Sequence, residues 1–254
     1  MLKIEKTEVV GFEAAIRGMR NPKNSWEKSD SQYCSEYPYT PIEGSCKYCP
    51  YDSMCNKSEK AMQQMYIIEN NDLDLMTRLR NAGTDHRKFM RMITVYLDIT
   101  APLYWWKEFD TYKVGTVANS CSTMHKIGDK KFEMSDFSTE HLMPSSYQCL
   151  GFTVKNLNAF RECWFMYDKI KNGDIPASKE AQKAVEHFSK KDIWWQMIQL
   201  LPSSYNQKRT VMLNYEVLAN IYKSRKDHKL DEWHTFCDWI DSLPYSELIT
   251  GEKK

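Results

Sequence analysis

A strip of short polar side chains occupies residues 112–125, with the sequence YKVGTVANSCSTMH. Asn119 and Ser122 stand three residues apart within it, and His86 lies upstream. A purely structural strand is filled more often with valine, isoleucine and aromatic residues. Asn and Ser also satisfy turns, which is the plainer interpretation of this pair. Because the small side chains leave room for a phosphate or a flat heterocycle, we expect a nucleotide or nucleotide-like cofactor to lie here.

A second group of residues that could bind a ligand is a cluster of cysteines. Four of the eight cysteines fall close together, namely Cys34, Cys46, Cys49 and Cys55. A Cys-x-x-Cys pair with two flanking thiols can complete a tetrahedral thiolate shell around zinc, and an iron–sulfur cluster would use the same ligands. The outer spacings are irregular and there is no second Cys-x-x-Cys pair, so ordinary reduced cysteines in a loop are the alternative. Any bound metal is expected to be structural rather than catalytic.

The composition is that of a globular chain able to bury a substantial core. It has 254 residues, of which 42% are hydrophobic and 27% charged. The formal net charge of +1 argues against a nonspecific nucleic-acid coat, which needs a basic excess. There is no run of about 18 apolar residues and no apolar segment at the N-terminus, so neither a membrane span nor a secretory signal is expected. We therefore expect a cytoplasmic location and reduced thiols.

Apolar periodicity predicts an α+β chain that is mostly helical, with few strands and no internal repeat. A strand followed by a short helix is expected in residues 2–17, and the alternating, β-branched stretch Thr94–Thr100 is typical of a strand. Pro102 either starts a helix or breaks that strand. Residues 20–60 and 126–150 are expected to be loops. The predicted helices are Asn71–Gly83, a segment capped by Asp85 and reaching Ile93, Leu157–Ile170, 177–200, Val211–Lys223 and 229–243.

The polar strip also resembles a family signature. Flavin-dependent thymidylate synthases carry R-H-R-x-x-S-x-N-x-x-S-x-R-Y, which laid on residues 112–125 without a gap matches at Asn119 and Ser122. Upstream, the family has a Gly-His-x-Ser helix start followed by a strand. Here D-H-R-K at residues 85–88 occupies that place, and MITVYLDI follows. The chain is similar to a divergent, phage-like or bacterial branch of this family.

A second region keeps the same register. The family runs from Leu-Pro to an Asn, then through a helix ending in Arg to an A-Q-x-E-I-R-like segment. This chain has Leu201-Pro202, Asn214 at the family's spacing, Arg225, and LDEWH with Glu232. The likeness extends over roughly residues 71–243, with a variable middle.

Several family positions carry different residues here. The family's Arg-His-Arg is Tyr112-Lys113-Val114, so two guanidiniums that would clamp phosphates are missing. Arginine suits bidentate phosphate binding in a way that neutral side chains do not. The remaining differences are Val117 for Ser, Met124-His125 for Arg-Tyr, and Glu216 and His234 each for Arg.

The resemblance implies a thymidylate synthase-like fold with a small antiparallel sheet, in a single domain over residues 1–254. A Cys-rich insertion at about 31–60 lies outside the likeness. The resemblance further implies FAD, a deoxyuridine monophosphate (dUMP) substrate, methylene-tetrahydrofolate, and a homotetramer with sites between subunits. In that family the flavin carries the hydride while the protein supplies positioning and electrostatics.

Residue by residue, the resemblance assigns cofactor contacts to four side chains: His86, Lys113, Asn119 and Arg225. It makes Ser120 and Ser122 nucleotide-facing donors and provides no obvious general base. The plainer interpretations are a helix cap for His86 and a solvent-exposed helix end for Arg225. Two other functions stay open: a non-catalytic nucleotide-binding or interaction protein that retains the fold, and a zinc-stapled nucleic-acid-binding module at residues 34–55, which the near-neutral charge disfavours.

Overall fold

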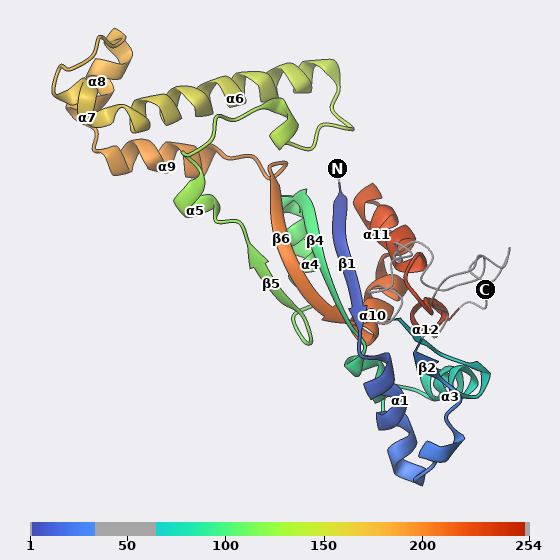
Figure 1. The fold of residues 1–254 in the computed structure, drawn as a ribbon. Helices are drawn as coiled ribbons and strands as arrows, with labels where there is room; N and C mark the ends of the chain where they lie inside the picture. The colour runs from blue at the N-terminus through green and yellow to red at the C-terminus, as the bar shows by residue number, and fades with distance from the viewer. Residues whose placement is uncertain (1, 34–64, 252–254) are drawn as a thin grey trace, which may run out of the picture. The chain divides into compact units, whose positions relative to one another are not determined.

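The computed structural model describes residues 2–33 and 65–251 (Figure 1). Contacts divide the chain into two compact units. The hairpin unit consists of Thr100–Phe109 and Ser120–Arg209, and the terminal unit of Leu2–Ile99, Asp110–Asn119 and Thr210–Lys254. We describe each unit by itself. Whether the whole chain forms one domain, as the sequence led us to expect, stays a prediction.

One antiparallel sheet supplies most of the strand structure. Its strands are β1 (Lys3–Val10), β4 (Thr94–Pro102), β6 (Asn206–Asn214) and β5 (Val117–Ser120), hydrogen-bonded in that order. In β4 the side chains of Val95, Leu97 and Ile99 are buried, which is the alternation that a half-buried strand requires. All four residues of β5 are exposed, and this strand lies at an edge of the sheet. The expected small antiparallel sheet is confirmed.

The terminal unit packs helices around a core of large aromatic side chains. Its helices are α1 (Phe12–Arg20), α3 (Asn70–Asn81), the 3-10 helix η3 (Arg87–Met92), α10 (Tyr215–Arg225), α11 (Asp231–Asp241) and α12 (Glu247–Thr250). Tyr215 and Trp233 are fully buried, and Phe12 contacts the Tyr215 ring edge to face at 5.7 Å. The Tyr215 hydroxyl donates to the backbone oxygen of Pro244 at 2.5 Å. This bond satisfies the one polar atom that the buried ring carries.

The hairpin unit is built on two long helices that lie side by side, α6 (Pro144–Phe165) and α9 (Lys190–Leu200) (Figure 1). The short helices α7 (Tyr167–Lys171) and α8 (Lys179–His187) connect them. The unit also contains α4 (Leu103–Phe109), α5 (Thr123–Lys126) and the 3-10 helix η4 (Met134–Asp136). Its main core cluster comprises Ile127, Phe132, Phe137, Leu150, Val154, Leu157 and Met197.

Several predicted boundaries are wrong for local reasons. The helix expected over Val211–Lys223 is the strand β6 followed by α10. The change occurs at Asn214, whose Oδ1 accepts from the Val217 amide at 3.0 Å and caps the helix. The predicted helix at 177–200 is interrupted, because Ser189 and Asp192 form a capping box that starts α9. The expected loop at 126–150 ends at Pro144, a residue favoured in the first turn of a helix, so α6 starts well before Leu157.

The two ends of the cysteine-rich segment meet in the terminal unit. Strand β2 (Gln32–Tyr33) pairs antiparallel with β3 (Tyr66–Ile67), and the rings of Tyr33 and Tyr66 pack edge to face at 5.0 Å. Before β2 the chain forms two 3-10 helices, η1 (Asn21–Lys23) and η2 (Trp26–Lys28). The two strands thus form a short stem next to residues 34–64, which lie outside the described part of the chain.

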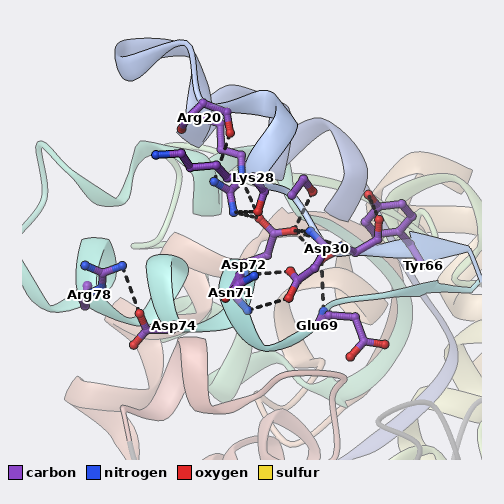
Figure 2. Close-up of polar contacts among 12 residues, drawn as sticks. Arg20, Lys28, Asp30, Tyr66, Glu69, Asn71, Asp72, Asp74 and Arg78 are labelled. Atoms are coloured by element: carbon purple, nitrogen blue, oxygen red, sulfur yellow. Dashed lines mark hydrogen bonds and ion pairs between the residues drawn. The ribbon is translucent and has the colours of Figure 1, made fainter.

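A buried ion pair supports this stem (Figure 2). Arg20, 4% exposed, lies 2.6 Å from Oδ1 of Asp72, which is fully buried. The other oxygen of Asp72 accepts from Ser29 Oγ at 2.7 Å and Ser31 Oγ at 2.6 Å. Asp30 in turn accepts from the Asp72 amide at 3.1 Å, in the first turn of α3. The charges are therefore paired and hydrogen-bonded, as buried charges need to be.

The environment of Asp72 also fixes its charge state. Burial alone would raise the pKa of this carboxyl group, but hydrogen bonds from Ser31, Ser29 and Arg20 outweigh it and lower the pKa below its ordinary value. Asp72 is therefore ionised at neutral pH. The network holds the residues before β2 against α3.

Candidate functional site

The loop that contains the polar strip runs along α10 in the terminal unit. At one end of this loop, Nε of Arg225 donates to the hydroxyl of Tyr112 at 2.9 Å. Further along, Gly115 lies against Asn214 and Val217 in the first turn of α10. The two sequence regions that carry the family resemblance are therefore in contact. We call residues 112–119 the α10 loop, and this name includes the first three residues of β5.

Gly115 is required at its position for two reasons. Its φ is +78°, in the left-handed region that side chains other than glycine rarely adopt. A Cβ atom placed there would lie 2.8 Å from Nδ2 of Asn214 and 3.2 Å from Cγ2 of Val217. Because Asn214 also caps α10 through Oδ1, the same side chain fixes both the helix start and the approach of the loop.

Arg225 is enclosed by aromatic rings. Its guanidinium carbon lies 4.7 Å from the centre of the Trp233 ring and 5.6 Å from that of Tyr112. Trp233 is fully buried in α11. These cation–π contacts anchor the arginine within the terminal unit. The roles of Tyr112 and Trp233 were missed from the sequence, although Tyr112 stands where the family carries an arginine.

Three polar groups of the α10 loop lack protein partners in the part of the chain that the structure describes. Oγ1 of Thr116 is buried and makes no hydrogen bond there. The ammonium group of Lys113 and the side-chain amide of Asn119 are exposed, and among described residues neither makes an ion pair or hydrogen bond. Buried hydroxyls usually have a partner, so the orphaned oxygen of Thr116 needs an explanation. No pattern in the sequence pointed to Thr116.

The two predicted serines belong to the hairpin unit. Ser120 is the last residue of β5 and is exposed. The hydroxyl of Ser122 accepts from the amide of His125 at 3.0 Å and caps the four-residue helix α5. This structural bond agrees with the plainer interpretation of Ser122, while nucleotide contacts for both serines stay predictions.

His86 precedes a cluster of charged side chains. It is exposed at the N-terminal end of η3, and its ring makes no hydrogen bond within residues 2–33 and 65–251. The guanidinium of Arg91 forms an ion pair with Glu216, and Nε of Arg87 lies 3.4 Å from the same carboxylate. Arg87 also donates to Asn220 at 3.3 Å. Glu216, which replaces a family arginine, thus attaches two arginines of η3 to α10.

The predicted metal ligands Cys34, Cys46, Cys49 and Cys55 lie outside the described residues. Among the residues that are described, no three histidine, cysteine or acidic side chains come together in a way that could hold a metal ion. Helices long and apolar enough to cross a membrane are likewise absent from the described part of the chain.

Comparison with solved structures identifies the fold. A crystal structure of thymidylate synthase X (ThyX) from Helicobacter pylori with FAD and dUMP matches with a TM-score of 0.56 and 13% identity, covering 99% of this chain and 98% of that one. A second structure of the flavin-dependent H. pylori enzyme, also with FAD and dUMP, gives 0.57 and 16%, covering 99% and 100%. The chain therefore has a ThyX-like fold.

A more distant match is PolB, a UMP/dUMP methylase from Streptomyces cacaoi bound with 5-Br UMP. Its TM-score is 0.46 with 10% identity, covering 99% of this chain and 95% of that chain. No protein-family model and no curated protein sequence matches this chain.

Proposed function

We propose that this protein is a flavin-dependent thymidylate synthase-like enzyme that methylates dUMP or a related pyrimidine nucleotide. The observation that carries the proposal is the α10 loop. In this loop the two regions of family resemblance are in contact, within a chain whose fold is ThyX-like over nearly its whole length. The proteins of similar fold from H. pylori were crystallised with FAD and dUMP.

The unpartnered groups of the α10 loop fit a flavin nucleotide. The Lys113 ammonium would pair with a phosphate, and the hydroxyl of Thr116 would gain the hydrogen bond that it lacks within the protein. Asn119, on the exposed edge strand β5, would offer an amide to the polar edge of a planar ring. FAD, when bound, would supply hydride-transfer chemistry.

Arg225 would act differently from Lys113. Because Tyr112 and Trp233 hold its guanidinium on their rings, its orientation is fixed before any ligand arrives. A cation fixed in this way would contribute a positive field without loss of side-chain freedom on binding. His86 would be a further cofactor contact, and Ser120 and Ser122 nucleotide contacts. Methylene-tetrahydrofolate as methyl donor and a homotetramer with sites between subunits complete the proposal.

Ligand binding gives the first test. The purified protein is expected to show a flavin absorption spectrum, or to acquire one on addition of FAD, and to bind dUMP in calorimetry. Replacement of Lys113 by alanine should weaken FAD binding by roughly 5-fold, the effect of losing about 1 kcal/mol at one charge contact. Lys155→Ala is a matched control, because Lys155 is also an exposed lysine but lies on α6 in the hairpin unit.

Activity gives the second test. The gene should allow a thymidine-requiring bacterium to grow without added thymidine, and light scattering should report the mass of a tetramer. Failure to take up flavin, together with failure to support growth, would reject the enzymatic proposal.

A second candidate is a nucleotide-binding protein that retains the fold without the chemistry. The observation in its favour is Glu216, which stands where the family has arginine. Its carboxylate forms ion pairs with Arg87 and Arg91. This candidate predicts dUMP binding in calorimetry without flavin uptake and without growth of the thymidine-requiring strain. It fails if neither dUMP nor a related nucleotide binds.

A further inference from the structure

A cavity of about 940 Å³ lies within the hairpin unit, among α6, α7, α8 and α9. Its size is at the upper end of the range of small-molecule sites, roughly 300–1,000 Å³. It is separate from the α10 loop, because none of its lining residues belongs to the terminal unit. The proposed function does not use it.

The walls of the cavity are mostly apolar and include several small side chains. Phe160, Ile193 and Met166 line it together with Ala159, Ala181 and Ala184. Within the described residues, the hydrophobic core next to the cavity contains only three buried side chains, those of Tyr167, Val185 and Ile193. The alanines thus leave open a space that larger side chains would have filled. A cavity with such walls favours an apolar body.

The charged side chains among the lining residues of the cavity are all acidic. Glu162, Glu180 and Asp192 line it with exposed side chains, and no lysine or arginine is among its described lining residues. Hydrogen bonds from Ser189 lower the pKa of Asp192, and bonds from its own amide and from Ser178 lower that of Glu180. Both carboxylates are therefore ionised at neutral pH. The lining carboxylates favour a cation over a phosphate or carboxylate. Lys191, whose charge also lowers the pKa of Asp192, does not line the cavity.

The helix ends around the cavity do not reverse this preference. The amino ends of α8 and α9 would attract anions, but Ser178 and Ser189 each accept a hydrogen bond from their own helix. Acidic residues already lie in both first turns. Met166, which lines the cavity, is both the C-cap of α6 and the N-cap of α7, so the partial charges of the two helix ends oppose each other there.

We propose that this cavity binds a small amphipathic cation, a molecule with an apolar, drug-sized body and a protonated amine. The body would lie against the alanine-lined wall between α6 and α8. The amine would lie at the rim near Glu162, Glu180 and Asp192. This inference is independent of the flavin and nucleotide site.

The chain carries its own reporters for a test. The Cys163 thiol lines the cavity, and burial raises its pKa, so it should react slowly with an alkylating reagent. Cys149 is an exposed thiol on the same helix and is not among the lining residues. Cys237 is buried, and burial, with Asp241 and Asp238 nearby, raises its pKa to about 12, so it should stay unreacted. Peptide mass spectrometry distinguishes the three.

The probes are three naphthalene derivatives with the same ring system: an alkylammonium, a neutral alcohol and a sulfonate. The alkylammonium should bind roughly tenfold more tightly than the sulfonate in calorimetry, a preference that two or three exposed carboxylates can provide. It should slow alkylation of Cys163 several-fold and leave Cys149 unaffected. High salt should reduce the preference.

Two variants locate the effect. Ala181→Trp fills the cavity and should abolish protection of Cys163, with circular dichroism to check that the unit is folded. Glu162→Gln keeps the volume and caps no helix, and it should cut the preference for the ammonium probe. Glu186→Gln is the control, because Glu186 is exposed on α8 but does not line the cavity.

Three results would overturn the proposal. The first is equal binding of the ammonium and sulfonate probes to the wild-type protein. The second is protection of Cys163 that persists in a folded Ala181→Trp protein. The third is protection without any probe that grows with protein concentration, which would mean that a second copy of the chain covers the cavity.

Discussion

Two polar regions of the terminal unit use their hydrogen-bonding groups in opposite ways. Around Asp72, both carboxylate oxygens have donors, and the Arg20 guanidinium beside it is almost fully buried (Figure 2). In the α10 loop, Thr116 Oγ1 is buried without a partner, and Lys113 and Asn119 make no polar side-chain contact with described residues. One region is saturated and the other is open.

This difference distinguishes structural polar groups from those available for binding. A buried charge that is fully paired holds elements together, and its loss leaves an uncompensated partner. A buried hydroxyl without a partner costs free energy in the folded protein and regains it when a ligand supplies a hydrogen bond. We therefore expect substitutions near Asp72 to change stability and those in the α10 loop to change binding.

The largest expected effect is that of Asp72→Asn. It leaves Arg20 buried without its counter-charge, which should lower the free energy of unfolding by about 3–5 kcal/mol. Urea denaturation followed by circular dichroism measures it. Asp74→Asn, on the same helix, removes an exposed ion pair with Arg78 and should cost less than about 0.5 kcal/mol. Similar losses in the two variants would contradict the assignment of Asp72 as the structural centre.

Acid should remove part of the same stabilisation. The pKa of Asp72 is lower in the folded protein than in the unfolded chain, where it is about 3.9. Its contribution is therefore fully present above the unfolded value and is lost as the pH falls through the folded-state pKa. The difference in unfolding free energy between wild type and Asp72→Asn should be constant from pH 7 to about pH 5 and narrow below about pH 4. The effect is smaller than that of substitution, because a protonated carboxyl keeps acceptor capacity on both oxygens, whereas asparagine places an NH2 donor against the donors that face Asp72.

The sequence predicts elements well where one period dominates. The predicted strand at Thr94–Thr100 is observed as β4, and the predicted helix at Asn71–Gly83 is observed as α3. In the first segment apolar residues alternate with polar ones, and in the second they recur at helical spacing, so each pattern favours one type of element. Strand β6 was missed because its apolar residues Val211–Leu213 and the apolar residues of α10 are separated by a single residue, Asn214, and together resemble the pattern of one helix. Only the capping bond of Asn214 shows where the strand stops, and that bond depends on the three-dimensional position of its side chain.

The contact between the two regions of family resemblance could be predicted from the sequence, but the details of that contact could not. The signature match indicated that residues 112–125 and the Asn214–Arg225 region belong together, and the contact of Tyr112 with Arg225 agrees with this. The stacking of Arg225 on Trp233 depends on the packing of α11, which spacing along the chain does not encode. The orphaned hydroxyl of Thr116 likewise follows from its surroundings and not from its residue type.

Gly115→Ala should have an intermediate effect. The positive φ costs a residue with a Cβ about 1–2 kcal/mol, and the added methyl group would clash with Asn214. Asn214→Ala alone should cost about 1 kcal/mol through loss of the helix cap. Because the second change removes the clash, the double variant should be less destabilised than the sum, with a coupling of at least about 0.5 kcal/mol in denaturation experiments. Strict additivity would show that the loop does not pack on the start of α10.

The smallest effect on stability, and the sharpest test of the open region, is that of Thr116→Val. Valine has nearly the same shape and removes a buried hydroxyl that has no partner, so the free energy of unfolding should stay the same or rise by up to about 1 kcal/mol. If the α10 loop binds a flavin nucleotide, the same variant should bind FAD several-fold more weakly in calorimetry. Loss of stability with unchanged ligand binding would mean that Thr116 has a structural partner, and the contrast between the saturated and the open region would fail at this residue.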